Sequence, residues 1–419
     1  MSKLLKKTEI ELYLILFLLS GMFKNLFFSI YGNNIIKIPL TIIFGILLIF
    51  MIYFKDIYNL KRLKEEYKSF IFLLLFFVWS LFSISYSSSE NYVWYKLLGL
   101  GTNFLAFFGV LIMKEISLKR FTKYFSYFTY FFSLIFFLIN PNSISKNFIF
   151  QEYFNEVYIQ GWYLVLGQLL IVNMLLIFSF SEKKKIIYNL LISFNIICLL
   201  GGRFPIVLAL IVFFIISIYL IQKKYLTKKL LIQFFKSLTI IILINSVLNL
   251  SSKTYQSLLL RSVYRFEVLS SSFNDINFLN DRESLNQKSL NQENNSFNKR
   301  LEYLLFSKNK IFKNKSSLIL GYGLGSFSNE YDQTDRRLYP HNIIVEIVFE
   351  LGLIGLLLAL AFLISNSSSY KGFFTNLALL AALTLLINSM KSSSIVDLRL
   401  LFALLAISIF HFNKLTLQN

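Results

Sequence analysis

The chain is divided into blocks of apolar residues, each about 15–23 residues long, separated for the most part by short polar gaps. An α-helix of this length crosses the ~30 Å hydrocarbon core of a bilayer. Hydrophobic residues make up 56% of the sequence and charged residues only 15%, against about 25% charged in soluble domains. The chain is therefore expected to be an all-α polytopic integral membrane protein.

The blocks predict about twelve transmembrane helices. The predicted spans cover residues 10–30, 35–54, 69–86, 93–113, 121–140, 161–180, 186–201, 204–222, 230–249, 341–363, 373–389 and 398–412. A long hydrophilic segment, residues 251–340, separates the ninth span from the tenth. We therefore divide the chain into a membrane domain at 1–250, a large loop at 251–340 and a second membrane domain at 341–419.

The positive charges of the gaps predict the orientation. Lys and Arg are concentrated in alternate gaps through the first eight spans, and such gaps face the cytoplasm. The short gaps on the other side hold few basic residues: Lys146, Arg203, Lys391 and, at the edge of the last span, Arg399. Both termini are thus expected in the cytoplasm and the large loop outside it, in a bacterial inner membrane with the active site facing the periplasm or exterior.

The net charge of +20 does not indicate a nucleic-acid partner, because the basic residues are spread over the gaps between spans. The single cysteine, Cys198, lies in an apolar block and is expected to be a packing residue. The sequence has no Asp-x-Asp pair, no His/Cys cluster and no Gly-rich phosphate loop followed by Lys. We therefore expect no metal site and no cofactor.

Within the large loop, residues 270–298 are rich in Asn, Ser and Gln and are expected to bury little surface. Residues 300–312 carry Leu301, Leu304, Leu305 and Ile311 at helical spacing. This pattern predicts a short helix that lies along the membrane surface.

Charged and titratable residues at the edges of spans are costly and therefore informative. Arg203 follows a Gly-Gly pair that breaks an apolar run, which places a guanidinium at the outer end of two spans. His341 precedes Asn342 at the start of a span, where the helix dipole favours a neutral imidazole that can accept a proton. The alternatives are an Arg that caps a helix end and a His with a structural hydrogen bond. His411, near the end of the last span, is expected to be structural.

Glu346 and Glu350 share a face of the same span. At that depth, carboxylates must face the bundle interior, a cation or water, and pairing with an arginine or a helix terminus is favoured over catalysis. Arg300 begins the amphipathic segment of the loop, which also holds Arg265. A loop arginine is usually a solvated charge, but arginine is also the group best suited to bind phosphate as a planar bidentate donor.

Three motifs resemble the signature of the O-antigen polymerase and O-antigen ligase superfamily. They are a Gly-x-Gly turn at residues 321–325, Pro-His-Asn at residues 340–342 and Glu-x-Gly-x-x-Gly at residues 350–355. Gly202 and Arg203 resemble the family's Ser-Arg-Gly motif in part, with Gly202 in place of Ser and Phe204 after the arginine. Arg300 resembles the family's loop arginine. The resemblance covers residues 186–363.

The resemblance implies an extracytoplasmic, GT-C-like glycosyltransferase that uses a glycan on a polyprenyl diphosphate. The absence of a ligand cluster predicts that the transfer is metal-independent. Arg203 and Arg300 would hold the diphosphate, and His341 would activate the acceptor hydroxyl. Glu350, Asn342 and Arg265 would support them. Membrane lipid, a chain-length regulator and a flippase are the further partners that the resemblance implies.

We interpret the chain as a polysaccharide polymerase of the O-antigen or capsule type that inverts the anomeric centre. The first alternative is an O-antigen ligase, which moves the glycan to a lipid core and uses the same donor. An alternative of another class is a flippase or transporter of lipid-linked oligosaccharides. The absence of inverted repeats and of symmetrically placed broken spans disfavours it.

Overall fold

The computed structural model describes residues 9–31, 40–54, 58, 66–113, 116–139, 162–180, 183–200, 202–222, 228–251, 287–366 and 377–416. Apart from one isolated bridge between Tyr58 and Met113, every regular element in these ranges is a helix. The chain forms two compact units.

The first unit comprises Met1–Met51 and Glu115–Asp281. Its helices are α2 (Ile10–Leu18), α3 (Ser20–Tyr31), most of α4 (Leu40–Phe54), α8 (Leu118–Ile139), α9 (Trp162–Phe180), α10 (Lys183–Leu200), α11 (Arg203–Gln222) and α12 (Lys228–Ser251). Helix α9 packs against α8, α10 and α11. Polar side chains join these apolar helices: the Ser126 hydroxyl donates to Asn173 Oδ1 at 2.7 Å, and the Tyr130 and Ser193 hydroxyls lie 3.0 Å apart. Such bonds hold helices together where water is excluded.

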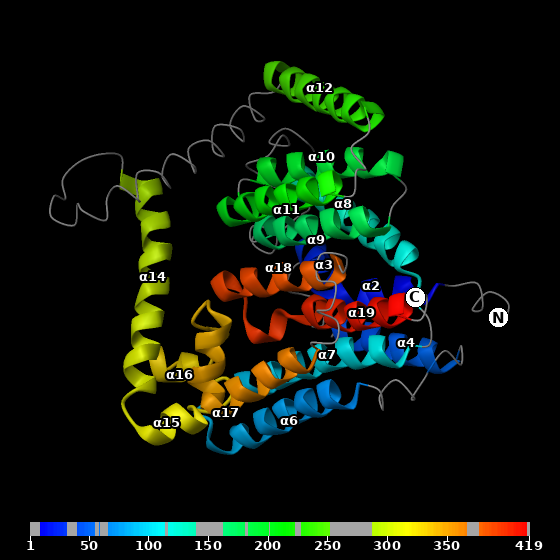
Figure 1. Ribbon diagram of the computed structural model, residues 1–419. Helices are drawn as coiled ribbons and strands as arrows, with labels where there is room; N and C mark the ends of the chain where they lie inside the picture. Colours follow the sequence, from blue (N-terminus) through cyan, green and yellow to red (C-terminus); the bar gives the residue numbers. More distant parts are fainter. Residues whose placement is uncertain are drawn as a thin grey trace. The chain divides into compact units, whose positions relative to one another are not determined.

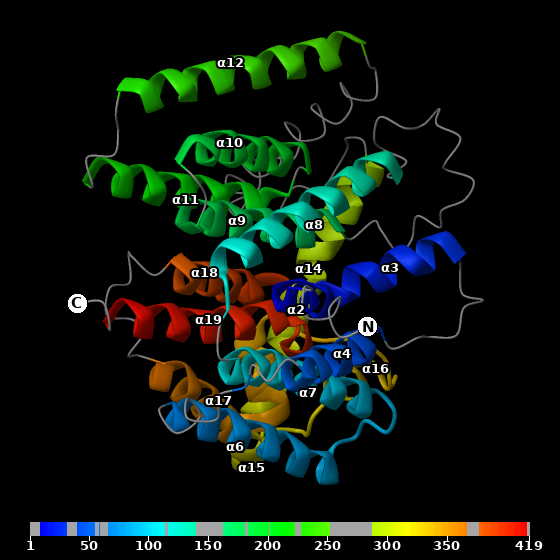
Figure 2. The same cartoon turned by 90° about the vertical axis from the view of Figure 1, so that its right-hand side faces the viewer.

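The second unit comprises Ile52–Lys114 and Arg282–Asn419. Its helices are α6 (Tyr67–Ser83), η2 (Ile84–Tyr86), α7 (Tyr92–Ile112), α14 (Gln287–Ile311), α15 (Lys315–Leu320), α16 (Phe327–Asp332), α17 (Ile343–Ser365), α18 (Leu377–Ser392), η7 (Ile395–Asp397) and α19 (Arg399–Thr416). Helix α17 packs against α6 and α15, and α19 packs against α7 and α18. Figures 1 and 2 show that α14 stands across the direction of α6, α7 and α17. The short helices α15 and α16 lie at the same end, where α17 begins (Figure 1).

In the described part of the chain, the first predicted span coincides with two helices, α2 and α3, and each of the other eleven overlaps an α-helix. Among the described residues, three helical segments are long and apolar enough to cross a membrane: Tyr67–Tyr86, Tyr92–Ile112 and Ile343–Ser365. A fourth is obtained if Ile10–Leu18 and Ser20–Ile30, bent by 63°, form one span. In seven of the other described helices the apolar segment is shorter, at 10–17 residues. The chain is thus an all-helical integral membrane protein, and the number of twelve spans stays a prediction.

The loop helix differs from the one expected at residues 300–312. Helix α14 begins at Gln287 and so includes part of the Asn- and Ser-rich stretch, where Gln, Glu and Lys favour a helix. Its expected apolar stripe is divided between two faces, because Ile311 is buried whereas Leu301 and Leu305 are exposed. Tyr303, which the pattern missed, lies with Ile311 on the face that packs against the protein.

Cysteine labelling tests the orientation. A cysteine in place of Ser289 is expected to react with a membrane-impermeant maleimide added outside the cell. A cysteine in place of Ser367 is expected to react only after the membrane is opened, because the alternation of Lys and Arg places residue 367 inside. Each variant is made with Cys198→Ser, which removes the native thiol. The reverse pattern, or labelling of both positions from one side, would contradict the orientation.

Candidate functional site

His341 stands at the entrance of α17 in a conformation that few residues adopt. Its φ is +58°, in the left-handed region that is costly for a residue with a Cβ. Asn342 follows as the N-cap, and its Oδ1 accepts hydrogen bonds from the backbone N–H groups of Ile344 (3.0 Å) and Val345 (3.1 Å). The Asn of the His-Asn pair therefore starts the helix, and this start fixes the backbone that carries the imidazole. Strain of this kind is concentrated at functional sites.

Two tyrosine rings flank the His341 imidazole. The ring of Tyr303, from α14, is stacked on it with the centroids 6.1 Å apart and an angle of 13° between the planes. The ring of Tyr339 lies at 4.5 Å and is tilted by 51°. Burial raises the pKa of Tyr339 from its ordinary value to about 12. The imidazole is thus held on two sides and is half-buried.

Arg300 lies on the same helix as Tyr303, three residues earlier. Residues at this spacing are neighbours on a helix surface, with Cβ atoms about 5–6 Å apart. Because Tyr303 stacks on His341, α14 brings Arg300 into the surroundings of the imidazole. That Arg300 and His341 act in one site stays a prediction.

An aromatic cluster fixes α14 in this place. Tyr303 and Ile311 are buried with Phe327 of α16 and Phe349 of α17, and Phe306 packs beside them. At the edge of the cluster, the Lys310 ammonium pairs with Glu330 at 2.9 Å, and the Tyr331 hydroxyl donates to Glu302 at 2.5 Å. The helix that carries Arg300 is thus attached to α17, which begins just after His341.

The Gly-x-Gly turn and the Glu-x-Gly motif form one structural unit. Helix α17 is broken at Gly352, whose φ is +67°, so the carbonyls just before the break lack helical partners. The backbone N–H of Tyr322 donates to the Phe349 carbonyl (2.8 Å), and that of Gly323 donates to the Glu350 carbonyl (2.9 Å). Trp79 Nε1 of α6 donates to the third carbonyl, that of Leu351, at 2.9 Å. Backbone hydrogen bonds therefore join the two motifs at the break in α17.

This arrangement predicts a strong effect at Gly352. A Cβ there would lie 2.1 Å from the carbonyl oxygen of Ile319 and would sit on a left-handed backbone. Gly352→Ala is expected to lower the free energy of unfolding by about 2–5 kcal/mol, the sum of backbone strain and overpacking. Gly101→Ala is the control, because a Cβ there meets nothing closer than Phe77 at 3.9 Å. Reversible unfolding in detergent micelles checks both. Equal stability of the two variants would contradict the close approach.

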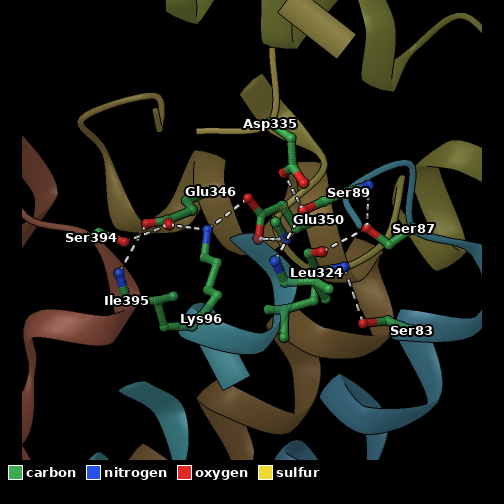
Figure 3. Close-up of polar contacts among 12 residues, drawn as sticks. Ser83, Ser87, Ser89, Lys96, Leu324, Asp335, Glu346, Glu350, Ser394 and Ile395 are labelled. Atoms are coloured by element: carbon green, nitrogen blue, oxygen red, sulfur yellow. Dashed lines mark hydrogen bonds and ion pairs between the residues drawn. The ribbon is translucent and has the colours of Figure 1, made fainter. Parts of the chain in front are cut away.

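The two carboxylates of α17 are paired with a lysine that the sequence reasoning missed. Lys96 of α7 is fully buried, and its ammonium lies 2.5 Å from Glu346 Oε1 and 2.6 Å from Glu350 Oε1. Figure 3 shows the ammonium between the two carboxylates. Pairing was expected for these glutamates, and Lys96 supplies the cation. The signal was a lysine inside an apolar block, since such a charge is costly unless it is paired.

The second oxygen of each carboxylate accepts a backbone hydrogen bond. Glu346 Oε2 accepts from the N–H of Ile395 at 2.9 Å, and Glu350 Oε2 accepts from the N–H of Gly325 at 2.9 Å. Ser394 Oγ donates to Glu346 Oε1 at 2.7 Å (Figure 3). Glu350, expected as a supporting residue, thus holds the Gly-x-Gly turn against α17.

Asp335 is a second residue that the sequence reasoning did not place. Its carboxylate accepts a hydrogen bond from Ser89 Oγ at 2.6 Å (Figure 3). It also accepts from the backbone N–H groups of Glu90 (3.0 Å) and Asn91 (2.5 Å), so it caps the start of α7. Burial opposes ionisation of Asp335, but these hydrogen bonds outweigh it and lower its pKa. Within the described ranges, no group of three His, Cys, Asp or Glu residues could hold a metal ion.

The predicted site residues are divided between the two units. Arg203 is the first residue of α11 and belongs to the first unit, whereas Arg300 and His341 belong to the second. His411 lies in α19. Arg265 lies outside the described residues. The meeting of Arg203 with Arg300 and His341 therefore stays a prediction.

The sequence around the site matches a known protein family. Residues 188–360 match the O-antigen ligase family. The match confirms the resemblance to the O-antigen polymerase and ligase superfamily, and it includes Arg203, Arg300 and His341. It implies a membrane glycosyltransferase-type enzyme acting on lipid-linked oligosaccharides. No match to the chain is found among curated proteins.

Proposed function

We propose that the chain is a polysaccharide polymerase that transfers glycan from a polyprenyl-diphosphate donor to a sugar hydroxyl of a lipid-linked repeat unit. The observation that carries the proposal is His341 itself. It lies at the entrance of a membrane-spanning helix, in a left-handed conformation, between two tyrosine rings and near the helix surface that carries Arg300. The match to the O-antigen ligase family over the same residues supports the reaction class.

In the proposed reaction, an imidazole nitrogen of His341 takes the proton of the acceptor hydroxyl. The hydroxyl oxygen forms a bond with the anomeric carbon as the bond from that carbon to the diphosphate oxygen breaks. Both electrons of the broken bond stay with the polyprenyl diphosphate, and the guanidinium groups of Arg203 and Arg300 stabilise its growing charge. Because attack and departure occur on opposite sides, the anomeric centre is inverted.

The second candidate is an O-antigen ligase, which is favoured by the description of the matched family. A ligase uses the same donor and the same chemistry, and only the acceptor differs, a lipid core in place of a second repeat unit. We place the site on the outer face of a bacterial inner membrane for both candidates, because the orientation predicted from the charges puts the loop and the start of α17 there.

Reconstitution separates these functions. The purified protein is placed in liposomes with lipid-linked repeat units alone, in the presence of a strong chelator. A polymerase is expected to give a ladder of longer polyprenyl-linked glycans. The chelator is expected not to prevent this, because no residue cluster for a metal is predicted. Product that forms only after a lipid-core acceptor is added would identify a ligase. Product that requires a divalent ion, or no product with either acceptor, would contradict the proposal.

A further inference from the structure

The break in α17 isolates the part of the helix that follows His341. Residues 343–351 lie between the N-cap Asn342 and the left-handed Gly352, so they form a separate helical piece of about two and a half turns. The helical hydrogen-bond ladder does not run continuously through the break. The orientation of this piece, and with it that of His341, therefore has to be fixed by side contacts.

Its strongest polar side contacts converge on Lys96. Glu346 and Glu350 are one turn apart on the piece, and both receive hydrogen bonds from the same buried ammonium. Among the described residues, Lys96 is the one cation within ion-pair distance of these carboxylates. Figure 3 shows how it stands between them. A single residue of α7 thus connects two successive turns of the piece.

The other partners of the two carboxylates are all donors. Glu346 faces Ser394 Oγ and the Ile395 N–H, and Glu350 faces the Gly325 N–H. Each carboxylate oxygen therefore acts as an acceptor, which is the role of an ionised carboxylate. Without Lys96, two buried negative charges one turn apart would repel each other with no cation to compensate them, a strongly unfavourable arrangement.

We propose that Lys96 is a positioning residue, which sets the orientation of residues 343–351 through Glu346 and Glu350 and so holds His341 in its working place. Lys96 sets the position of the imidazole through the helical piece and not through direct contact with the ring. The catalytic consequence rests on the proposed function of His341 as a base, whereas the structural consequence does not.

The test uses the small number of histidines. The chain has two, so His411→Ala leaves His341 as the only imidazole. In this background, Lys96→Met replaces the ammonium by an apolar group of similar length. We expect a changed ring signal of ¹⁵N-labelled His341 in the NMR spectrum and a several-fold change in its rate of reaction with diethylpyrocarbonate. We also expect kcat to fall about 10–100-fold with the KM for the donor within about twofold, because a displacement of about 1 Å costs up to 10² in rate.

Asn103→Leu is the matched control. Asn103 lies on α7 two turns after Lys96, is also buried, and donates to the Ile395 carbonyl at 2.6 Å. It touches the same neighbouring segment but neither carboxylate of α17. Its replacement is expected to leave the His341 signal and kcat near those of the parent, which separates loss of position from a general loss of packing.

Ser394→Ala covers the case in which Lys96→Met fails to fold. This change keeps every charge and removes one hydrogen bond to Glu346, so the His341 signal is expected to move in the same direction by a smaller amount. An unchanged His341 signal and diethylpyrocarbonate rate in every folded variant of Lys96 and Ser394 would overturn the positioning role. A shifted signal with unchanged kcat would support positioning and would instead contradict the role of His341 as the base.

Discussion

Replacing His341 with alanine is expected to lower the rate of glycan transfer by about 10²–10⁴-fold, the usual contribution of a positioned general base. The imidazole stands at the start of α17, flanked by Tyr303 and Tyr339, where alanine leaves no group that can take the acceptor proton. Binding of the donor is expected to persist, because the two arginines assigned to the diphosphate remain. The loss should therefore appear in kcat more than in the donor Kd.

The comparison with His411→Ala makes this test specific. His411 lies in α19, far along the chain from the motif residues, and its replacement is expected to be nearly neutral. Glycan chains in cells are compared by gel at equal amounts of membrane protein, and donor binding is measured on the purified variants. Normal glycan synthesis by His341→Ala would show that the imidazole is not the base.

Arg203→Lys is expected to fail as severely as Arg203→Ala, with losses of at least about 10²-fold in transfer. A guanidinium offers a planar fork of donors to a phosphate, whereas an ammonium is a compact point charge that cannot form the same paired bonds. The assigned role is to stabilise the departing diphosphate, whose charge grows as the bond to the sugar breaks. Retention of the positive charge alone should therefore not preserve the rate.

Lys119→Ala provides the control for the loss of a positive charge. Lys119 lies near the start of α8, in a gap that the charge pattern places in the cytoplasm, and its replacement is expected to leave transfer unchanged. Rates are measured with saturating and with limiting donor, so that weak binding and slow chemistry are separated. Activity of Arg203→Lys near that of the parent would contradict bidentate recognition of the diphosphate.

The positions of the helices were predictable because apolar blocks of membrane length are a local property of the sequence. His341 and Asn342 were predictable as the start of a span for the same reason. Lys96 was visible as a charge inside such a block, but its partners were not, because Glu346 and Glu350 are 250 and 254 positions away. An ion pair across that separation depends on how helices pack and not on any local pattern.

The contacts of the His341 imidazole could not be predicted from the sequence either. Tyr303 and Ile311 occupy the packed face of α14, while the spacing of Leu301 and Leu305 emphasised the exposed face. Spacing identifies a helix but does not say which of two apolar faces a neighbour covers. The role of the Gly-x-Gly turn could not be predicted for a related reason, since its backbone N–H groups donate to the carbonyls at the break of α17 only in the folded chain.

The most direct test of the central claim is an experimental structure of the protein in a lipid nanodisc with polyprenyl diphosphate bound. We expect phosphate oxygens within about 3 Å of the guanidinium groups of both Arg203 and Arg300. We also expect the His341 imidazole on the side of the diphosphate where the sugar would stand, within the width of one sugar ring. A diphosphate that touches neither arginine, or an imidazole farther than one sugar ring from both guanidinium groups, would contradict the assignment.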